Sequence, residues 1–112
     1  MKKVDKPWGY EEWVEQNDAY VVKRLFMKNG CKCSLQYHER KKETIVVLTG
    51  ELTVIMNEDS KRFNPFEWVT IEPGQVHRMA AENGDCMYLE CSTTELDDVV
   101  RVADEYGREQ NQ

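Results

Sequence analysis

The chain has 112 residues, enough for one hydrophobic core, and its 15 basic and 21 acidic residues give a net charge of -6. This acidic balance argues against a nucleic-acid partner, because such binding depends on Lys and Arg side chains that neutralise phosphates. A small anion held in a locally basic pocket is still compatible with it. The apolar runs are far shorter than the about 20 residues of a membrane helix, and no apolar segment follows the charged residues 1–6, so we expect a cytoplasmic protein with no membrane partner.

Short alternating segments, separated by turn-forming residues, run through most of the chain. Alternation of polar and apolar residues is typical of half-buried strands, and dipeptides such as Asn29-Gly30 and Asn64-Pro65 interrupt it. We expect about eight strands, at residues 8–14, 19–27, 31–38, 44–48, 51–56, 67–71, 76–81 and 87–91. Residues 57–60 are expected to form a turn, residues 96–106 one or two helical turns, and residues 109–112 a polar end. This order predicts an all-β barrel or sandwich.

Four cysteines offer either a disulfide framework or a set of thiol ligands: Cys31, Cys33, Cys86 and Cys91. Because no secretory signal is visible, we expect reduced thiols that pack mainly as small hydrophobic side chains. The one residue between Cys31 and Cys33 is also a shorter spacing than zinc-binding cysteine pairs usually have. A disulfide or a thiolate metal site is the alternative.

The chain has two histidines, and each lies where a predicted strand meets a turn. Gln36 and His38 are two residues apart on one strand, so their side chains share a face. A strand-turn-strand after His38 would bring Glu43 back beside it, and His77 follows a Pro-Gly turn. Two imidazoles, a carboxylate and an amide oxygen suit one divalent ion, with zinc expected first and manganese, iron, cobalt or nickel as alternatives. Histidines that only pack in the core or lie on the surface are the competing interpretation.

Two motifs with regular internal spacing carry these residues. The first is Gly30-x5-Gln36-x-His38-x4-Glu43-x6-Gly50, within residues 30–50, and the second is Glu72-Pro73-Gly74-Gln75-Val76-His77, within residues 66–81. Their order and spacing resemble the two motifs of the cupin superfamily, with Gln36 in place of a histidine and Ala81 in place of a closing asparagine. The resemblance implies a single cupin domain over residues 1–112, that is, an all-β, jelly-roll-like barrel or double-stranded β-helix.

A closer resemblance covers nearly the whole chain. The matching segments are Lys6-Pro7-Trp8-Gly9, Val22-Lys23-Arg24, Ser34-Leu35-Gln36-x-His38, Asp97-Asp98-Val99-Val100-Arg101 and Asp104-x-Tyr106-Gly107-Arg108. Together they are similar to the C-terminal cupin of type II mannose-6-phosphate isomerases, which also carry a mannose-1-phosphate guanylyltransferase domain. We expect a standalone version of the isomerase half. Glu39 and Arg40 replace histidines of that family, and Thr44-Ile45 replaces a tryptophan.

The resemblance implies roles for individual residues. Gln36, His38, Glu43 and His77 fall on the metal-binding positions. Lys41 and Arg101 are expected to be catalytic. Arg78, Arg101 and Lys23 are expected to bind a small phosphorylated sugar, and Arg24 is a weaker candidate for the same role. The reaction implied is metal-dependent interconversion of mannose 6-phosphate and fructose 6-phosphate. The base that moves the proton is left open among four residues: Lys41, Lys42, Glu39 and Glu90.

Two other functions fit the same fold, because cupins host many chemistries. One is a different cupin enzyme, such as a sugar epimerase or an iron-dependent dioxygenase. The other is a non-catalytic module that binds a metal or a sugar. We also expect a homodimer that pairs through the strand at residues 8–14, with Trp8, Trp13 and Trp68 in the core or in the dimer interface.

Overall fold

Three neighbouring strands bury every second side chain, and this pattern defines one wall of the structure. They are β3 (Val21–Met27), β5 (Glu43–Thr49) and β10 (Cys86–Ser92). Since successive side chains of a strand point to opposite faces, one face of this wall is interior and the other is exterior. The computed structural model describes residues 2–103, which contain strands and loops and no helix. That range accordingly holds no helix able to cross a membrane.

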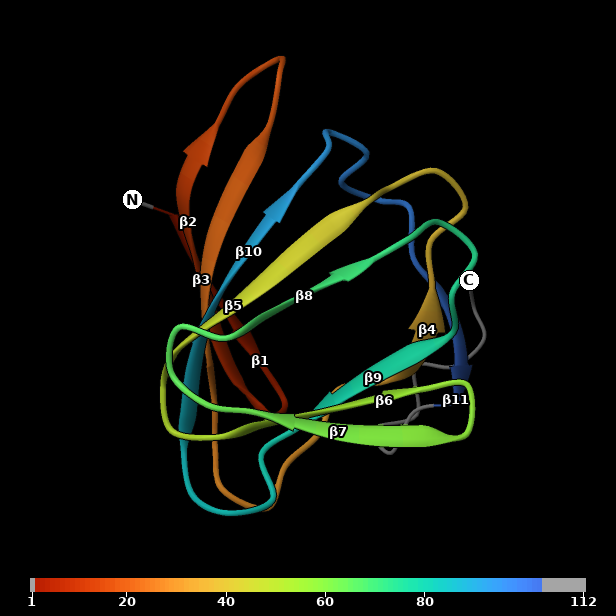
Figure 1. Cartoon of the computed structure of the whole chain (residues 1–112). Coiled ribbons are helices and arrows are strands. Elements are labelled where there is room, and N and C mark those ends of the chain that lie inside the picture. Colours follow the sequence, from red (N-terminus) through yellow and green to blue (C-terminus); the bar gives the residue numbers. More distant parts are fainter. Residues whose placement is uncertain (1, 104–112) are drawn as a thin grey trace.

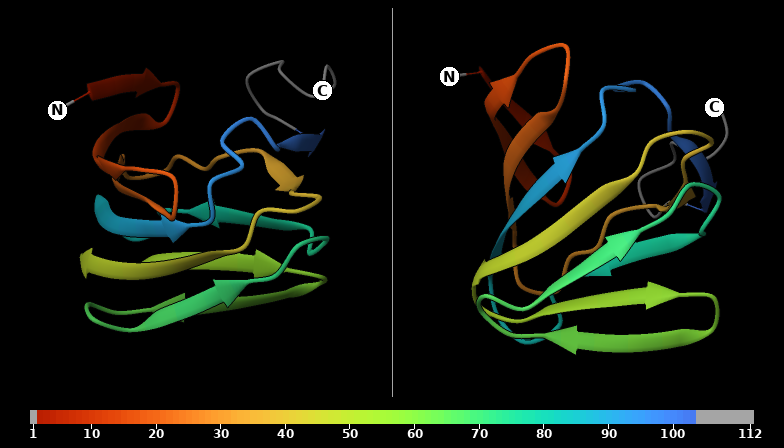
Figure 2. Two further views of the ribbon diagram at one scale, coloured as in Figure 1. Left: turned by 90° about the horizontal axis from the view of Figure 1, so that it is seen from above. Right: turned by 45° about the horizontal axis from the view of Figure 1, so that its top comes forward.

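Within residues 2–103, eleven strands form two antiparallel sheets that face each other (Figures 1 and 2). The six-stranded sheet has the order β1 (Lys2–Lys6), β2 (Gly9–Gln16), β3, β10, β5 and β8 (Trp68–Ile71). The five-stranded sheet has the order β11 (Val100–Ala103), β4 (Leu35–Tyr37), β9 (His77–Ala80), β6 (Leu52–Met56) and β7 (Asp59–Phe63). The expected all-β barrel is therefore confirmed, and residues distant in sequence become neighbours across its strands.

The hydrophobic core lies between the two sheets. Its buried members are Trp8, Leu25, Met27, Ile45, Val47, Leu52, Val54, Ile71, Met79, Ala81, Cys86 and Tyr88. Gly50, which ends β5, has φ of 79°, and a Cβ atom there would lie 2.2 Å from the carbonyl oxygen of Asp85. Only glycine fits at this approach between two loops, which explains the sharp end of the strand.

Three of the eleven strands in the described residues were not expected from the sequence, and β4 covers only Leu35–Tyr37 of the strand expected at residues 31–38. β1 was not expected because of its lysines, yet Lys2 and Lys3 lie 4.2 and 4.3 Å from the ring centres of Trp13 and Tyr10 on β2. These cation–π contacts favour a strand that is poor in strand-forming residues. β7 begins inside the expected turn, because the chain reverses at Asn57, whose φ of 55° suits a tight hairpin.

The helical turn expected at residues 96–106 is wrong where the structure describes it, because residues 100–103 form β11. Val100 and Arg101 pair with Tyr37 and Gln36 of β4, which lie 63 and 65 residues earlier in the chain, so no local pattern indicates this strand. Residues 104–106 and the polar end at 109–112 lie outside the described residues. So do Asp104, Tyr106, Gly107 and Arg108 of the C-terminal motif.

The expected edge strand at residues 8–14 lies inside the six-stranded sheet, since β2 pairs with both β1 and β3. The exposed edge on that side belongs to β1. Trp8 lies in the core, as expected, whereas Trp68 on β8 is 67% exposed. All four cysteines are free.

Candidate functional site

Three donor side chains meet at one end of the barrel: His38 after β4, Glu43 at the start of β5 and His77 at the start of β9. All three are buried, and one donor atom from each lies within 4.8 Å of the others. The Nε2 atom of His38 is 3.6 Å from Oε1 of Glu43, and Nε2 of His77 is 3.4 Å from its Oε2. The structure thus brings together three of the four residues that the sequence placed on metal-binding positions.

The hydrogen bonds of the two imidazoles fix which nitrogen carries a proton. Nδ1 of His38 lies 2.6 Å from the carbonyl oxygen of Asp98, and Nδ1 of His77 lies 2.8 Å from that of Gln75. A carbonyl only accepts, so Nδ1–H is the donor in both bonds. In a neutral ring, the Nε2 lone pair then points at Glu43. Both Nε2 atoms and Oε1 of Glu43 are buried without a hydrogen-bond partner among the described residues.

A divalent cation fits this arrangement. Three buried electron-pair donors that face one another are unfavourable unless a positive charge lies between them. Ligands at about 2.1 Å from a shared tetrahedral ion stand about 3.4 Å apart, close to the separations in this cluster. Metal-binding histidines also donate the other ring N–H to a carbonyl, as both do here. Burial raises the pKa of Glu43, but hydrogen bonds from the imidazoles, when their Nε2 atoms are protonated, and the charge of Lys41 outweigh it and lower that pKa.

Gln36 is next to the cluster rather than clearly part of it. Its backbone pairs directly with His77 across β4 and β9, so the two side chains share a face. Its amide oxygen accepts a hydrogen bond from the hydroxyl of Ser34. The role of Gln36 as a fourth ligand therefore stays a prediction.

The turn between His38 and Glu43 is held by Asp98. The carboxylate of Asp98 accepts the backbone N–H groups of Glu39, Arg40 and Lys41 at 3.0, 2.7 and 2.9 Å. Its own carbonyl oxygen accepts from His38. These amide donors lower the pKa of Asp98 against the opposing effect of burial, which keeps the clamp charged. The sequence contained Asp98 in the C-terminal motif but gave no sign of this role.

Replacing Asp98 with alanine is expected to weaken metal binding by about 10-fold, because partners that orient metal ligands typically contribute 10–100-fold. Titration of the purified apoprotein with zinc measures this change. Asp85→Ala is the matched control, since Asp85 also accepts a loop amide, that of Asn29, at 2.9 Å in a loop outside the site. Equal zinc affinity in Asp98→Ala and wild type would show that the clamp does not position His38.

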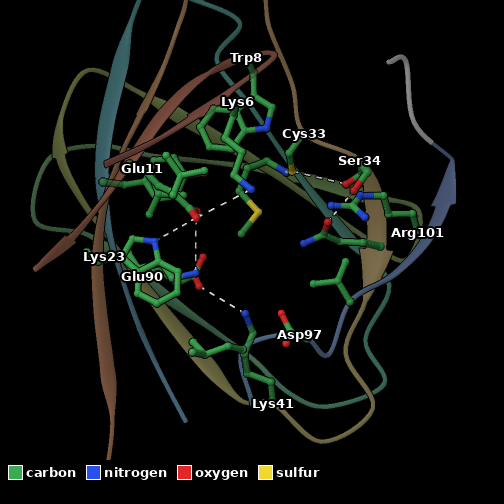
Figure 3. Close-up of a pocket in the computed structure, with 18 of the residues that line it drawn as sticks. Lys6, Trp8, Glu11, Lys23, Cys33, Ser34, Lys41, Glu90, Asp97 and Arg101 are labelled. Carbon is green, nitrogen blue, oxygen red and sulfur yellow. Dashed lines mark hydrogen bonds and ion pairs between the residues drawn. The ribbon is translucent and has the colours of Figure 1, made fainter. Parts of the chain in front are cut away.

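A cavity of about 540 Å³ opens beside the cluster, between the two sheets (Figure 3). Five cationic side chains line it: Lys2, Lys6, Lys23, Lys41 and Arg101. Three acidic ones line it as well: Glu11, Glu90 and Asp97. The cavity is therefore locally basic in a protein of net charge -6. Gln36 and Lys41 also line the cavity and connect it to the cluster of His38, Glu43 and His77.

Lys41 is buried, and its ammonium group lies between two carboxylates. Its ammonium nitrogen lies 3.4 Å from both Glu43 and Glu90. Burial lowers the pKa of Lys41, but the charges of Glu90 and Glu43 raise it by a larger amount, so the net effect is a raised pKa. Lys41 is therefore an ammonium near neutral pH and a poor base.

Glu90 has the opposite character. Burial and then the charge of Glu43 raise the pKa of Glu90. The charges of Lys41 and Lys23 lower that pKa by a smaller amount, so it is raised overall. Among the four candidate bases, Lys42 is exposed and paired with Glu72 at 3.5 Å, and Glu39 is exposed. A cavity carboxylate with a raised pKa is the type of group that serves as a general base near neutral pH.

The three predicted substrate-binding cations lie in different places. Lys23 lines the cavity beside Glu90 and lies 3.7 Å from Glu11. Arg101 lines the opposite wall, and its Nε atom is buried without a hydrogen-bond partner in the described residues. Arg78 does not fit its expected role, because it points to the other face of β9 from His77 and donates to the carbonyl oxygens of Cys33 and Ala103.

Some cavity residues were not expected. Trp13 was assigned to the core or an interface, but its indole N–H donates to Glu11 at 3.2 Å and its ring faces the ammonium groups of Lys2 and Lys23. Cys33 also lines the cavity, and burial raises its pKa to about 11, so it is a thiol rather than a thiolate ligand at neutral pH.

Residues 1–104 match the family described as mannose-6-phosphate isomerase C-terminal. The chain belongs to this family. It is 35% identical, over 96% of its length, to mannose-1-phosphate guanylyltransferase of Escherichia coli K12, and 30% identical to the xanthan biosynthesis protein XanB of Xanthomonas campestris pv. campestris. It spans only 23% and 24% of these two relatives, about a quarter of each.

Solved structures confirm the cupin fold of this family member. KdgF from a Halomonas species has a TM-score of 0.78 at 16% identity, over 87% of this chain and 91% of KdgF. A cupin-superfamily sugar phosphate isomerase from Silicibacter pomeroyi has a TM-score of 0.72 at 14% identity, over 83% of this chain and 71% of that protein. At these identities the likeness concerns the fold alone. The relation to mannose-phosphate enzymes comes from the family match and the sequence relatives.

Proposed function

We propose that the chain is a metal-dependent aldose–ketose isomerase of a phosphorylated hexose, with mannose 6-phosphate and fructose 6-phosphate as the pair. One observation carries the proposal. Arg101, Gln36 and His77 are direct neighbours across β11, β4 and β9, so their side chains share one face. Two strand spacings, about 10 Å, separate Arg101 from His77. An extended six-carbon sugar phosphate bridges such a gap, with its phosphate at Arg101 and its reacting carbons near the cluster.

The charges of the cavity support a phosphorylated substrate. A guanidinium binds a phosphate through two parallel hydrogen bonds, and the buried Nε of Arg101 is an unused donor among the described residues. Lys23 adds a second cation on the opposite wall. A neutral sugar would leave both cations without an anionic partner from the ligand.

The residues around the cluster suit a proton transfer between adjacent carbons. A divalent ion held by His38, Glu43 and His77, with Gln36 as the fourth ligand, would supply a Lewis acid for substrate oxygens. Glu90 takes the proton from carbon 2 of the aldose and returns it to carbon 1. At the same time, the hydroxyl on oxygen 2 loses its proton as the ketone forms, and oxygen 1, the former aldehyde oxygen, gains a proton. The Lys41 ammonium stabilises the negative charge that develops on oxygen in between.

Incubation of the purified protein with mannose 6-phosphate tests the proposal. Zinc, manganese, cobalt, nickel and ferrous iron are each supplied to the apoprotein, and fructose 6-phosphate is measured. No product with any metal, from protein that is folded and binds the metal, would contradict it. Tight binding of the sugar phosphate without turnover would instead support a non-catalytic cupin, and oxygen uptake with iron would support a dioxygenase. Cytoplasmic location and a homodimer stay predictions.

Replacing Arg101 with alanine should raise KM for the phosphorylated sugar about 10–100-fold, since charge-assisted hydrogen bonds are worth about 1.5–3 kcal/mol. Metal content should not change, because Arg101 lies two strands from His77. Arg101→Lys should recover part of the loss. Arg62→Ala, an exposed arginine on β7, is the control. An unchanged KM in Arg101→Ala would place the phosphate elsewhere.

A further inference from the structure

Within residues 2–103, the strand that carries Arg101 is paired on one side only. β11 lies at the end of the five-stranded sheet, next to β4. Arg101 lies opposite Gln36, and the next pair, two residues on along β11 but only one along β4, joins Ala103 to Leu35. Val102 is therefore an extra residue that makes a β-bulge, a feature that redirects the side chains beside it. The direction of Arg101 depends on how this bulge is held.

Arg78 binds the chain on the far side of the bulge. Its Nε atom donates to the carbonyl oxygen of Cys33 at 2.9 Å, and a terminal nitrogen of the same guanidinium donates to that of Ala103 at 3.2 Å. Arg78 belongs to β9, Cys33 lies two residues before β4, and Ala103 ends β11. One side chain thus connects β9 with the segment that leads into β4 and with the end of β11.

An irregular backbone pairing leaves the carbonyl of Cys33 available for this contact. The N–H of Cys33 donates to the carbonyl of Met79 at 3.0 Å, but the N–H of Met79 donates back to the thiol of Cys33 at 3.3 Å. In a regular antiparallel pair, both N–H groups would bond to the opposite carbonyl. The carbonyl of Cys33 accepts from Arg78 instead, and hydrogen bonds from a charged donor are stronger than those between neutral groups.

Arg101 enters the cavity from β11 (Figure 3), and its buried Nε has no hydrogen-bond partner among the described residues. A donor kept for a ligand is not fixed by a protein partner at that atom, so its position has to come from the backbone that carries it. We infer that Arg78 is a positioning residue for Arg101. By holding the bulge of β11, it directs the guanidinium of Arg101 at the phosphate of the substrate, a ligand whose identity rests on the proposed function.

Amide hydrogen exchange of the purified full chain tests the first step. Arg78→Met removes both hydrogen bonds but keeps a long side chain, so the amides of residues 100–103 should exchange at least about 10-fold faster. Exchange in β3 and β10, which belong to the other sheet, should not change. Arg78→Lys should restore part of the protection, because an ammonium donates to one of the two carbonyls. Arg62→Met, at an exposed arginine of the same sheet, is the matched control.

Calorimetric titration of the zinc-loaded protein with mannose 6-phosphate tests the second step. Arg78→Met should weaken binding about 5-fold, because the phosphate loses about one well-made hydrogen bond. Zinc affinity should not change, because the ring of His77 is held by the carbonyl of Gln75 on the other face of β9. In the Arg101→Ala background, Arg78→Met should have no further effect, since a residue that acts through Arg101 has nothing left to position.

Three results would overturn the inference: unchanged exchange at residues 100–103 in Arg78→Met, an unchanged affinity for the sugar phosphate, or a full additional loss in the Arg101→Ala background. The last result would mean that Arg78 acts by a route other than Arg101. A wild type that binds the sugar phosphate without converting it would contradict the isomerase proposal alone, because neither measurement depends on turnover. A wild type that binds no sugar phosphate would overturn both.

Discussion

Replacing His77 with alanine should remove the metal and abolish isomerisation. His77 supplies one of three buried donors, and its Nε2 has no hydrogen-bond partner among the described residues. Without His77, His38 and Glu43 are the two strong ligands that remain. Gln36 would add only a neutral amide oxygen, which is too little to hold the ion against water. We expect metal content to fall from about one ion per chain to below about 0.1 after dialysis. Activity should fall by more than about 100-fold, a larger loss than for residues that only hydrogen-bond to metal ligands.

Metal content and thermal unfolding measure this result without an activity assay. Zinc that binds only the folded state raises Tm, so it should raise Tm of the wild type and leave that of His77→Ala unchanged. Met79→Ala is the control, since Met79 is buried on the same strand and the same face but offers no strong ligand. A full zinc complement in His77→Ala would contradict the three-donor site.

Local pattern was enough to predict the central strands, whereas the cluster of His38, Glu43 and His77 was predicted from the resemblance to the two cupin motifs. The alternation in β3, β5 and β10 reflects a wall with one buried face, which any sequence forming it must show. His38 and Glu43 flank one tight turn, so their approach follows from short-range geometry. The place of His77 in the cluster could be predicted only from the spacing of the second motif. No local pattern shows it, because its neighbour across the sheet, Gln36, is 41 positions earlier in the chain.

Features that depend on distant partners could not be predicted. β11 forms because β4 offers it an edge, and Lys41 is buried because Glu43 and Glu90 surround its ammonium group. In the sequence, Lys41 is only the middle of three basic residues. Arg78 is different, since alternation already puts it on the opposite face from its neighbour His77. The signal that separates Arg78 from the cavity was therefore present in the sequence.

Glu90→Gln should lower kcat by about 10²–10⁴, the usual contribution of a general base, while metal content is unchanged. A base acts when ionised, so wild-type kcat should rise with pH through the raised pKa of Glu90. The midpoint of this acid limb should lie above the ordinary pKa of a glutamate, because burial and then Glu43 stabilise the protonated form. In Glu90→Gln, the residual activity should lack that limb.

Substitutions at two neighbours of Glu90 should shift the acid limb of the kcat profile in opposite directions. The charge of Glu11 raises the pKa of Glu90, so Glu11→Gln should move the acid limb to lower pH. Lys23 lowers that pKa, so Lys23→Met should move the limb to higher pH. Lys41 also faces Glu90, but it contacts Glu43, a proposed metal ligand, so a change at Lys41 would affect the metal site as well. Opposite shifts in the kcat profiles of the two variants would identify Glu90 as the titrating base. Shifts in the same direction, or a limb that persists in Glu90→Gln, would assign proton transfer to another group.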